Sequence, residues 1–510
     1  MILAALISLL IIGGLLAWLS DRFNPALPRI IALVTVFGVL LLMLDLLGED
    51  KGWITVIDVS WLPRFGISFY LAVDGLSLLL IILTAFLGLI AIGAAWDEIT
   101  ERAGFFYFNL LWTLAGVVGV FTALDLFLFF FFWEVMLIPM YFIIAIWGHE
   151  NKNYAAMKFF IFTQVTGMLM LVSILIMAYF HYLQFGVMSF SYEDLMRVST
   201  SGETQLLIML GFFIAFATKL PSIPFHSWLP DAHSQAPTAG SVILAGILLK
   251  TGAYGLIRFV VPLFPEAAME FAPVAMTLAT ISILYCAKVA FAQQDIKRLI
   301  AYTSVSHMGF VMLGVFALNE LALQGAVMTM LAHGLSAAAL FMLAGGLQHR
   351  IHTRNMTEMG GFWVRVPRMA VVAMFFSVAA LGMPGLGNFV GEFLSLLGAF
   401  QANLWLTVIA CFGLVLASVY SLWVLQQVFQ GKYNNSNIDE SKLTDLTKRE
   451  MLFFGAMMIG LVWMGLHPQS FLDLSAGTLS DVLTANSTTT VESVAVGTEL
   501  VPPVLLGATP

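Results

Sequence analysis

Long blocks of apolar residues, separated by short polar connections, follow one another along almost the whole chain. A helix of about 20 residues, at about 1.5 Å per residue, spans the roughly 30 Å hydrocarbon core of a bilayer. The pattern predicts an all-α polytopic membrane protein with about fourteen transmembrane helices, near residues 1–19, 28–47, 74–96, 105–122, 125–147, 155–181, 205–229, 236–262, 271–292, 298–318, 321–347, 369–401, 403–430 and 450–467. The Ser/Thr-rich tail after residue 467 is expected to lie outside the membrane and to be loosely ordered unless it docks.

Two of the predicted spans are interrupted by proline. The seventh, FFIAFATKLPSIPFHSWLPD, contains Pro221 and Pro224, and the twelfth, FFSVAALGMPGLGNFVGEF, contains Pro384 among glycines. Proline removes a helix hydrogen bond, and lipid cannot satisfy the backbone groups that are freed. Broken backbone at membrane depth therefore belongs beside protein or a water-filled cavity.

The two interrupted spans also share a sequence pattern, because a Phe-Phe pair precedes Pro221 and Pro384 by the same offset. One span is odd-numbered and the other even-numbered, so they run in opposite directions. This predicts two inverted five-helix repeats with broken helices 7 and 12. The expected regions are 1–104 with N-terminal helices 1–3, 105–262 with helices 4–8, 263–430 with helices 9–13, and 431–510 with helix 14 and the C-terminal tail.

The composition supports a membrane protein without chemistry-bearing cofactors of its own. Hydrophobic residues make up 60% of the chain and charged residues 10%, against about 25% charged residues in soluble domains. Two isolated cysteines, Cys286 and Cys411, cannot ligate an iron–sulfur cluster. No glycine-rich nucleotide loop is apparent, so we expect no redox centre, metal or cofactor in this chain and no nucleic-acid partner.

Lys and Arg segregate strongly between the two sets of alternate loops. One set holds 15 of them and the other holds 4, while Lys219, Lys250 and Lys288 fall inside spans. Positive residues favour the cytoplasmic side, which predicts that both termini are periplasmic. The larger set contains Arg22, Arg29, Arg102, Lys152, Lys158, Lys297, Arg298, Arg350, Arg354, Arg365, Arg368, Lys432, Lys442, Lys448 and Arg449, and the smaller contains Lys51, Arg64, Arg197 and Arg258.

Six ionisable residues are predicted at membrane depth, where each charge costs at least about 3 kcal/mol. Four are expected near the centres of their spans, His307 toward the cytoplasm and Glu392 toward the outside. The pattern indicates a row of proton-transfer sites across the bundle. Its predicted members, which we call the central row, are Glu134, Lys219, Lys250, His307, His333 and Glu392.

Structural roles are the alternatives for these residues. Glu134 and Lys219 could be a clip between helices, Lys250 could extend toward the surface, and Glu392 could satisfy broken backbone. His307 and His333 could be neutral packing residues. The segment PFHSWLPDAHSQAP adds His226, Asp231 and His233, for which loop and cap chemistry competes with a role in proton uptake.

Four segments resemble the antiporter-like subunits of respiratory complex I, and among these the M subunits of bacterial NADH:quinone oxidoreductases, the counterparts of mitochondrial subunit 4. They are FFFFWEVMLIPMYF, HSWLPDAHSQAPTAGSVILAGILLKTGAYGLIRF, QQDIKRLIAYTSVSHMGF and GNFVGEF. The resemblance covers essentially the whole chain except the tail. It implies that Glu134 is the span-five glutamate, Lys219 the broken-helix lysine, Lys250 the connecting lysine, and Glu392 the terminal glutamate, with His307 and His333 as histidines of the same axis.

The resemblance also implies an activity and partners. It implies a proton-translocating subunit of NADH:quinone oxidoreductase in the bacterial inner membrane, with FMN, iron–sulfur clusters and quinone in partner subunits and two paralogous antiporter-like subunits as neighbours. A subunit of a multisubunit sodium/proton antiporter is the alternative. Similar antiporter and longer complex I subunits carry lysine in place of Glu392, so Glu392 favours the M subunit. A purely structural spacer is a third possibility.

Changes in the distance between Glu134 and Lys219 could drive proton movement. At an effective dielectric constant of about 20, a unit charge pair is worth roughly 4 kcal/mol at 4 Å and roughly 2 kcal/mol at 8 Å. Moving a proton against about 150 mV requires about 3.5 kcal/mol. One pair movement is therefore insufficient, and several coupled sites are expected to share the work.

Overall fold

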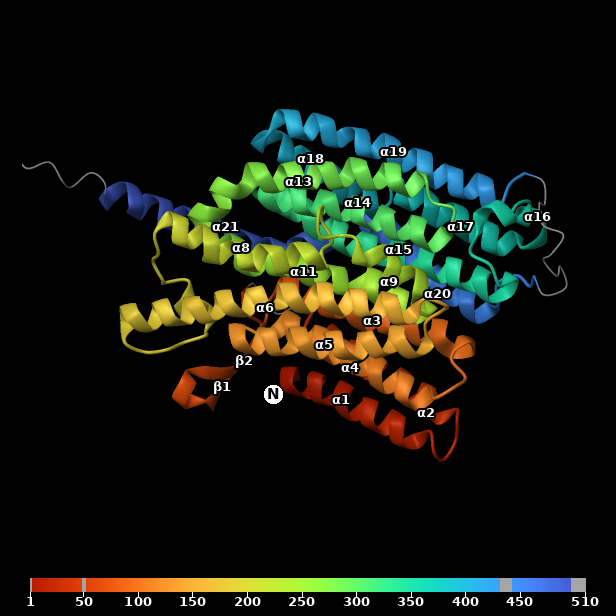
Figure 1. Ribbon diagram of the computed structural model, residues 1–510, viewed down its shortest axis with the longest axis horizontal. Coiled ribbons are helices and arrows are strands. Elements are labelled where there is room, and N and C mark those ends of the chain that lie inside the picture. The colour runs from red at the N-terminus through yellow and green to blue at the C-terminus, as the bar shows by residue number, and fades with distance from the viewer. Residues whose placement is uncertain (1, 48–51, 432–442, 497–510) are drawn as a thin grey trace, which may run out of the picture.

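The computed structural model describes residues 2–47, 52–431 and 443–496, with backbone only from 485 onward. Long helices lie side by side along the long axis of the molecule (Figure 1). The helices before the first break are α1 (Ile2–Ser20), α2 (Leu27–Leu44), α3 (Gly75–Glu98), α4 (Ala103–Thr122), α5 (Leu126–Trp147), α6 (Lys152–Phe185), α7 (Tyr192–Leu195) and α8 (Gly202–Lys219). Those that follow are α9 (Trp228–Gln235), α10 (Thr238–Ile243), α11 (Leu249–Gly255), α12 (Val261–Leu263), α13 (Pro265–Phe291), α14 (Ile296–Phe316), α15 (Glu320–Ile351), α16 (Phe362–Arg365), α17 (Pro367–Ala380), α18 (Gly387–Ala402), α19 (Leu404–Val428), α20 (Lys448–Leu466) and α21 (Gln469–Val496).

The helices confirm an all-α polytopic architecture. Among the described residues, twelve helical segments are long and apolar enough to cross a membrane. The two interrupted segments, α8–α9 and α17–α18, are not among them. The count of fourteen requires both of these to cross as well, and it stays a prediction, as do the four regions and the inverted repeats.

Both predicted interruptions are present. Helix α8 ends at Lys219 and α9 begins at Trp228, while α17 ends at Ala380 and α18 begins at Gly387. In the first break, the indole N–H of Trp228 donates to the carbonyl of Thr218 at 2.9 Å. Protein groups, rather than lipid, therefore satisfy backbone freed by the break.

One buried span, Thr238–Leu263, is built from alternating α- and π-helical turns. The π-helical turns are η2 (Leu244–Leu248) and η3 (Leu256–Val260), on either side of α11. A π turn replaces the usual i→i+4 hydrogen bonds by i→i+5 bonds and frequently marks a functional site. This span packs against α3, α8 and α15, so it lies in the interior of the bundle.

A β-hairpin joins α2 and α3, and the expectation of helices alone missed it. Strand β1 (Thr55–Leu62) pairs with β2 (Ile67–Val73) in antiparallel register. The intervening turn ends at Gly66, whose φ of 70° suits glycine. The alternation in TVIDVSWL is the signal of a strand, but the segment is too short and too polar to be read as a span.

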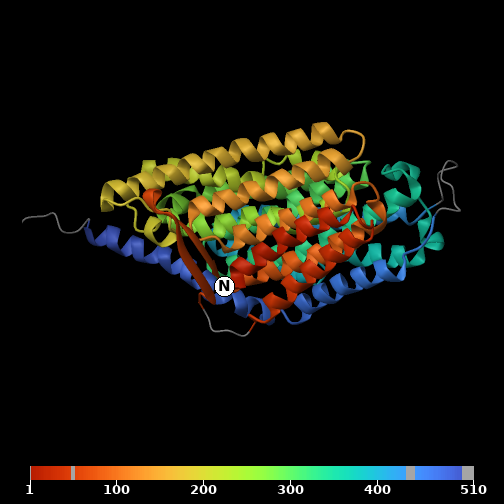
Figure 2. The ribbon, with the colours of Figure 1, turned by 90° about the horizontal axis from the view of Figure 1, so that it is seen from below.

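The described part of the C-terminal tail forms helix α21, which packs against α3 and α15, so the docked form of the expectation applies to it. Figures 1 and 2 show the start of α1, the hairpin and α21 toward the same end of the bundle. An even number of membrane crossings would place the start of α1 and helix α21 on the same side, in agreement with this arrangement. Three residues of the charge pattern, Lys51, Lys432 and Lys442, lie outside the described residues.

Candidate functional site

The connecting lysine and an imidazole form a buried pair in the middle of the bundle. Lys250, on α11, is fully buried, and its Nζ lies 2.8 Å from Nδ1 of His333 on α15. The same ammonium group donates to the carbonyl of Ala245 at 2.6 Å. Ala245 belongs to the π turn η2, so the irregular backbone supplies an acceptor to the buried cation.

A second buried cluster lies beside this pair. His307, on α14, places Nδ1 2.6 Å from Oε1 of Glu392 on α18. Its other ring nitrogen lies 2.9 Å from the hydroxyl of Tyr420 on α19. The rings of His307 and His333 are 5.7 Å apart between centroids. Four of the six predicted residues therefore form one chain, in the order Lys250, His333, His307 and Glu392.

The Glu392 carboxyl group has one free oxygen. Oε2 has no hydrogen-bond partner within the described residues, although Glu392 is only 1% exposed. This oxygen faces Gly382, where a side-chain methyl would lie 3.4 Å away. Gly382 has a φ of 79° and belongs to the second break. The free oxygen is therefore directed at the interrupted backbone of the span.

Glu134 and Lys219 lie in the first half of the bundle without direct contact. No ion pair within 4.0 Å joins them in the described part of the chain, although their charges interact. The ammonium nitrogen of Lys219 is buried and has no hydrogen-bond partner there. It lies 5.1 Å from the ring centroid of Trp133 and 5.5 Å from that of Phe159.

The aromatic surroundings explain how Lys219 is tolerated. Ring faces attract a cation, and the attraction is about 2 kcal/mol or more when the site is desolvated. Such contacts hold the ammonium group without a fixed acceptor, so its position can change at low cost. Nearby, Pro139 interrupts the hydrogen bonding of α5 one turn after Glu134. Both members of the pair thus lie beside irregular helix geometry.

One predicted detail of depth is wrong. His307 was expected on the cytoplasmic side and Glu392 toward the outside, but atoms 2.6 Å apart lie at the same depth. His307 is near the middle of α14 (Ile296–Phe316). The error arose from counting residues along straight spans, since the break before α18 shifts Glu392 relative to a continuous helix.

Residues of the HSWLPDAH segment divide between two roles. Asp231 forms ion pairs at 2.7 Å with Lys158 of α6 and Arg298 of α14. It therefore ties α9, α6 and α14 together, a role between helices that differs from the loop or cap chemistry named as its structural alternative. His233 is fully buried, and neither of its ring nitrogens has a hydrogen-bond partner within the described residues.

Sequence reasoning missed Tyr420, Trp133 and Phe159. Tyr420 lies in the apolar stretch LVLASVYSLWVL, where a single phenolic hydroxyl between two serines was the available signal. Trp133 and Phe159 gave none, because aromatic residues in spans are ordinarily packing residues. Within the described residues no group of three or more His, Cys, Asp or Glu side chains could hold a metal ion.

Comparison with known proteins relates this arrangement to a family. Residues 123–417 match the family described as NADH:quinone oxidoreductase/Mrp antiporter, transmembrane. The chain is 52% identical over 497 residues to NADH-quinone oxidoreductase subunit M of Escherichia coli, which covers 94% of this chain and 97% of the relative. The chain belongs to the M-subunit branch of this family.

More distant members of the family agree over their full length. NADH-ubiquinone oxidoreductase chain 4 of Marchantia polymorpha is 37% identical over 486 residues, covering 94% of this chain and 97% of the relative. A chain in the structure of respiratory complex I from Thermus thermophilus is 31% identical, with a TM-score of 0.85 over 95% of this chain and 100% of that chain. The resemblance to M subunits and to mitochondrial subunit 4 is confirmed, and so is the antiporter-like fold.

Proposed function

We propose that this chain translocates protons from cytoplasm to periplasm in the bacterial inner membrane, as a membrane subunit of NADH:quinone oxidoreductase. The observation that carries the proposal is the buried chain from Lys250 through His333 and His307 to Glu392. Each group can bind and release a proton, and their contacts leave only short steps between them. Charge pairs that served only to hold helices together would not need a continuous series of titratable groups.

Glu134 and Lys219 would load this chain. When Lys219 approaches Glu134 its proton is held, and when the pair separates the proton is driven toward Lys250. The structure has the pair apart and Lys219 without a hydrogen-bond acceptor, which supports the open arrangement. Water would connect Lys219 to Lys250, because no described hydrogen bond joins them, and broken helix α8–α9 would line that water.

Glu392 would be the release group of the chain. Its free oxygen faces the break at Gly382, where water from the periplasmic side could reach it. The energy would come from quinone reduction in other subunits, which are expected to hold FMN, iron–sulfur clusters and quinone. The lateral neighbours are expected to be the two paralogous antiporter-like subunits.

The test compares proton uptake with electron transfer in membrane vesicles containing the assembled complex. Replacing Lys219 by alanine should lower proton uptake by at least about tenfold, because a positioned proton-transfer group typically speeds its step by about 10²–10⁴-fold. Quinone reduction by the uncoupled complex should continue. Lys288, which is exposed on α13, provides the matched control as Lys288→Ala. Normal uptake by an assembled Lys219→Ala complex would contradict the proposal.

A further inference from the structure

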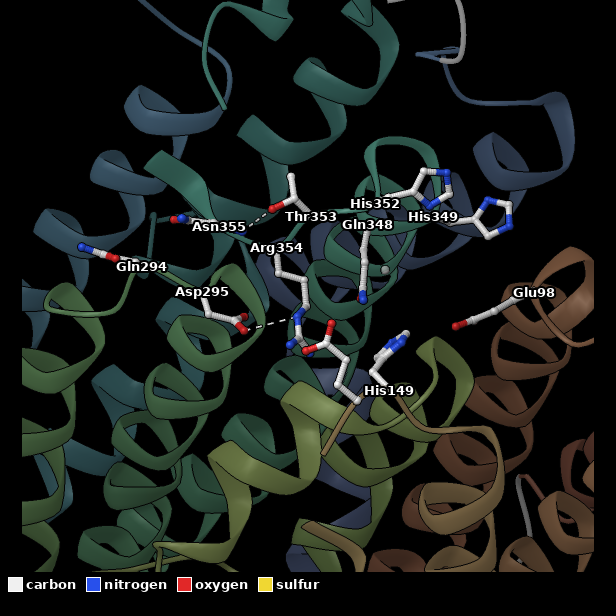
Figure 3. A pocket seen from close by; sticks show the side chains of 12 residues that line it. Glu98, His149, Gln294, Asp295, Gln348, His349, His352, Thr353, Arg354 and Asn355 are labelled. Carbon is white, nitrogen blue, oxygen red and sulfur yellow. Dashed lines mark hydrogen bonds and ion pairs between the residues drawn. The ribbon is translucent and has the colours of Figure 1, made fainter. Parts of the chain in front are cut away.

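A polar cavity of about 640 Å³ opens where α3 ends, at the opposite end of that helix from the hairpin (Figure 3). Glu98, His149 and Arg354 are among its lining residues, and Figure 3 shows these side chains converging on it. A second cavity, of about 230 Å³, shares Glu98 and His349 with it. In the proposed orientation both open on the cytoplasmic side. No residue of the central row is among the lining residues of either cavity.

A buried cation, Lys297, lies directly behind the cavity wall. Its side chain is fully buried, and Nζ lies 3.4 Å from Nε2 of His149. The same nitrogen donates to the carbonyl of Ala236 at 3.3 Å, and its charge interacts with Glu98 and Asp295. Lys297 therefore contacts the cavity through His149 and extends toward the start of the central π-helical span.

Glu98 binds the first residue of the π-helical span, Thr238. Both of its carboxylate oxygens accept the backbone N–H of Thr238, each at 3.1 Å. A carboxylate at a helix N-terminus is stabilised by the helix dipole. Glu98 therefore joins the cavity wall to the start of the span that carries Lys250.

His233 lies within electrostatic range of both Lys297 and the central-row residue Lys250. It is fully buried, stacks on Phe341 with 4.2 Å between ring centroids, and has two ring nitrogens without partners in the described part of the chain. Both Lys297 and Lys250 act electrostatically on it, and it acts in turn on His333. A buried imidazole normally has a hydrogen-bond partner, so two open nitrogens require an explanation.

We propose that His149, Lys297 and His233 form the branch through which protons pass from the polar cavity into the central row. This inference rests on the proposed function and deepens it. Lys297 gives a proton to His233, which passes it to the Lys250–His333 pair, and Lys297 is then reprotonated from the cavity through His149. Each group returns to its starting state, no electrons move, and water carries the proton where no direct hydrogen bond exists.

The electrostatics of His149 fit a relay rather than a store. Burial, together with the positive charges of Lys297, Arg354 and Lys152, lowers the pKa of His149 to about 4. The imidazole is therefore neutral near pH 7 and holds an added proton only briefly. A neutral imidazole has one donor and one acceptor nitrogen, so it can take a proton on the cavity side and give one on the Lys297 side.

The experiment uses variants that keep charge or polarity but cannot carry a proton. Lys297→Arg keeps a positive charge, and guanidinium does not release its proton in proteins. His233→Gln keeps a polar side chain and cannot titrate. The matched controls are Lys288→Arg, on the exposed face of α13, and His181→Gln, a buried histidine of α6 that contacts the carbonyl of Val187. Proton uptake per NADH is measured in vesicles holding the assembled complex, whose amount is normalised by flavin content.

Both variants should lower proton uptake per NADH by about tenfold or more, and both controls should match wild type. Normal uptake by either variant would overturn the branch. If a substitution at a buried position prevents assembly, His149→Gln, at a half-buried position, tests the branch in the same assay. It should lose proton uptake to the same extent, and normal uptake would overturn the branch. Lys219→Ala is measured in parallel to separate the two proposals. If Lys219→Ala loses proton uptake while Lys297→Arg and His233→Gln keep it, the branch is rejected and the proposed function is retained.

Discussion

The carboxyl group of Glu392 is bound at one oxygen and free at the other, and this asymmetry permits a sharp test. Gln keeps a hydrogen-bonding oxygen and an amide that could face Gly382, but it cannot titrate. We expect Glu392→Gln to assemble normally and to lose about tenfold or more of its proton uptake. Uptake would be measured with a pH-sensitive dye in vesicles.

The alternative for Glu392, a carboxylate that only satisfies broken backbone, predicts the reverse. An amide would serve that purpose as well, so the Gln variant would pump at the wild-type rate. Asn388, buried on the same helix with its amide nitrogen 3.0 Å from Ser336 Oγ, supplies a control through Asn388→Asp. If Glu392→Gln lowers proton uptake no more than Asn388→Asp does, Glu392 is not part of the pathway.

Glu134 is the second residue whose role depends on charge. At an effective dielectric constant of about 20, the interaction of Glu134 with Lys219 changes by roughly 2 kcal/mol between 4 and 8 Å. Glu134→Gln removes this interaction and should impair pumping, whereas Glu134→Asp keeps the charge on a shorter side chain and should retain part of the activity. Proton uptake at equal flavin content distinguishes the two variants. If Glu134→Gln and wild type show equal uptake, Glu134 and Lys219 serve only to hold helices together.

At the scale of elements, irregular helices supply the polar surroundings of the buried charges. The π turn η2 provides the Ala245 carbonyl that accepts from Lys250. The break after α8 leaves Lys219 at a helix end, and the break before α18 brings Gly382 to the free oxygen of Glu392. In a regular helix the backbone carbonyl and N–H groups bond to each other and are not available to a side chain. Lys250, Lys219 and Glu392 each lie beside a departure from regular helix geometry, where such backbone groups are available.

The contact between α3 and the tail helix is close enough to be tested by one methyl group. The backbone of Leu474 in α21 contacts Gly75, the first residue of α3, so closely that a side chain there would collide with it. Gly75→Ala should displace α21 and destabilise the protein by about 1–3 kcal/mol, as overpacking does. A lower melting temperature of the solubilised complex and faster proteolysis of the tail are the expected results.

Gly455, on α20, provides the matched control for this prediction. A methyl group there would meet nothing within 4 Å, so Gly455→Ala should leave the melting temperature unchanged or raise it slightly, because alanine favours a helix by about 1 kcal/mol. Equal melting temperatures for Gly75→Ala and wild type would show that α21 is not held by α3.

At the scale of the whole molecule, charge distribution and helix placement give one orientation. The start of α1 and helix α21 lie toward the same end as the hairpin, while the loops richer in Lys and Arg lie at the other (Figure 1). We expect both termini to be periplasmic. Alkaline phosphatase fused after residue 510 should therefore be active in cells, and green fluorescent protein fused there should be dark. The opposite result would invert the direction of proton transfer proposed here.

The hydrophobic pattern was sufficient for the helices, their approximate limits and the two interruptions. Burial of about 20 apolar residues in lipid is a local property of each segment, and proline acts on the backbone within one turn. Six ionisable residues could be identified for the same reason, since a charge in an apolar span is conspicuous in the sequence. Family resemblance then supplied their expected roles from the first half of the chain to the second.

Only the tertiary structure decided which of these groups touch. His307 and Glu392 are separated by 85 positions, and their 2.6 Å contact depends on the packing of α14 against α18. Tyr420 and the aromatic rings around Lys219 join the site through the same long-range packing, so no local pattern announced them. The hairpin, docked helix α21 and the polar cavity beside Glu98 likewise arise from contacts between distant segments, because their free energy comes from surfaces that meet only in the folded chain.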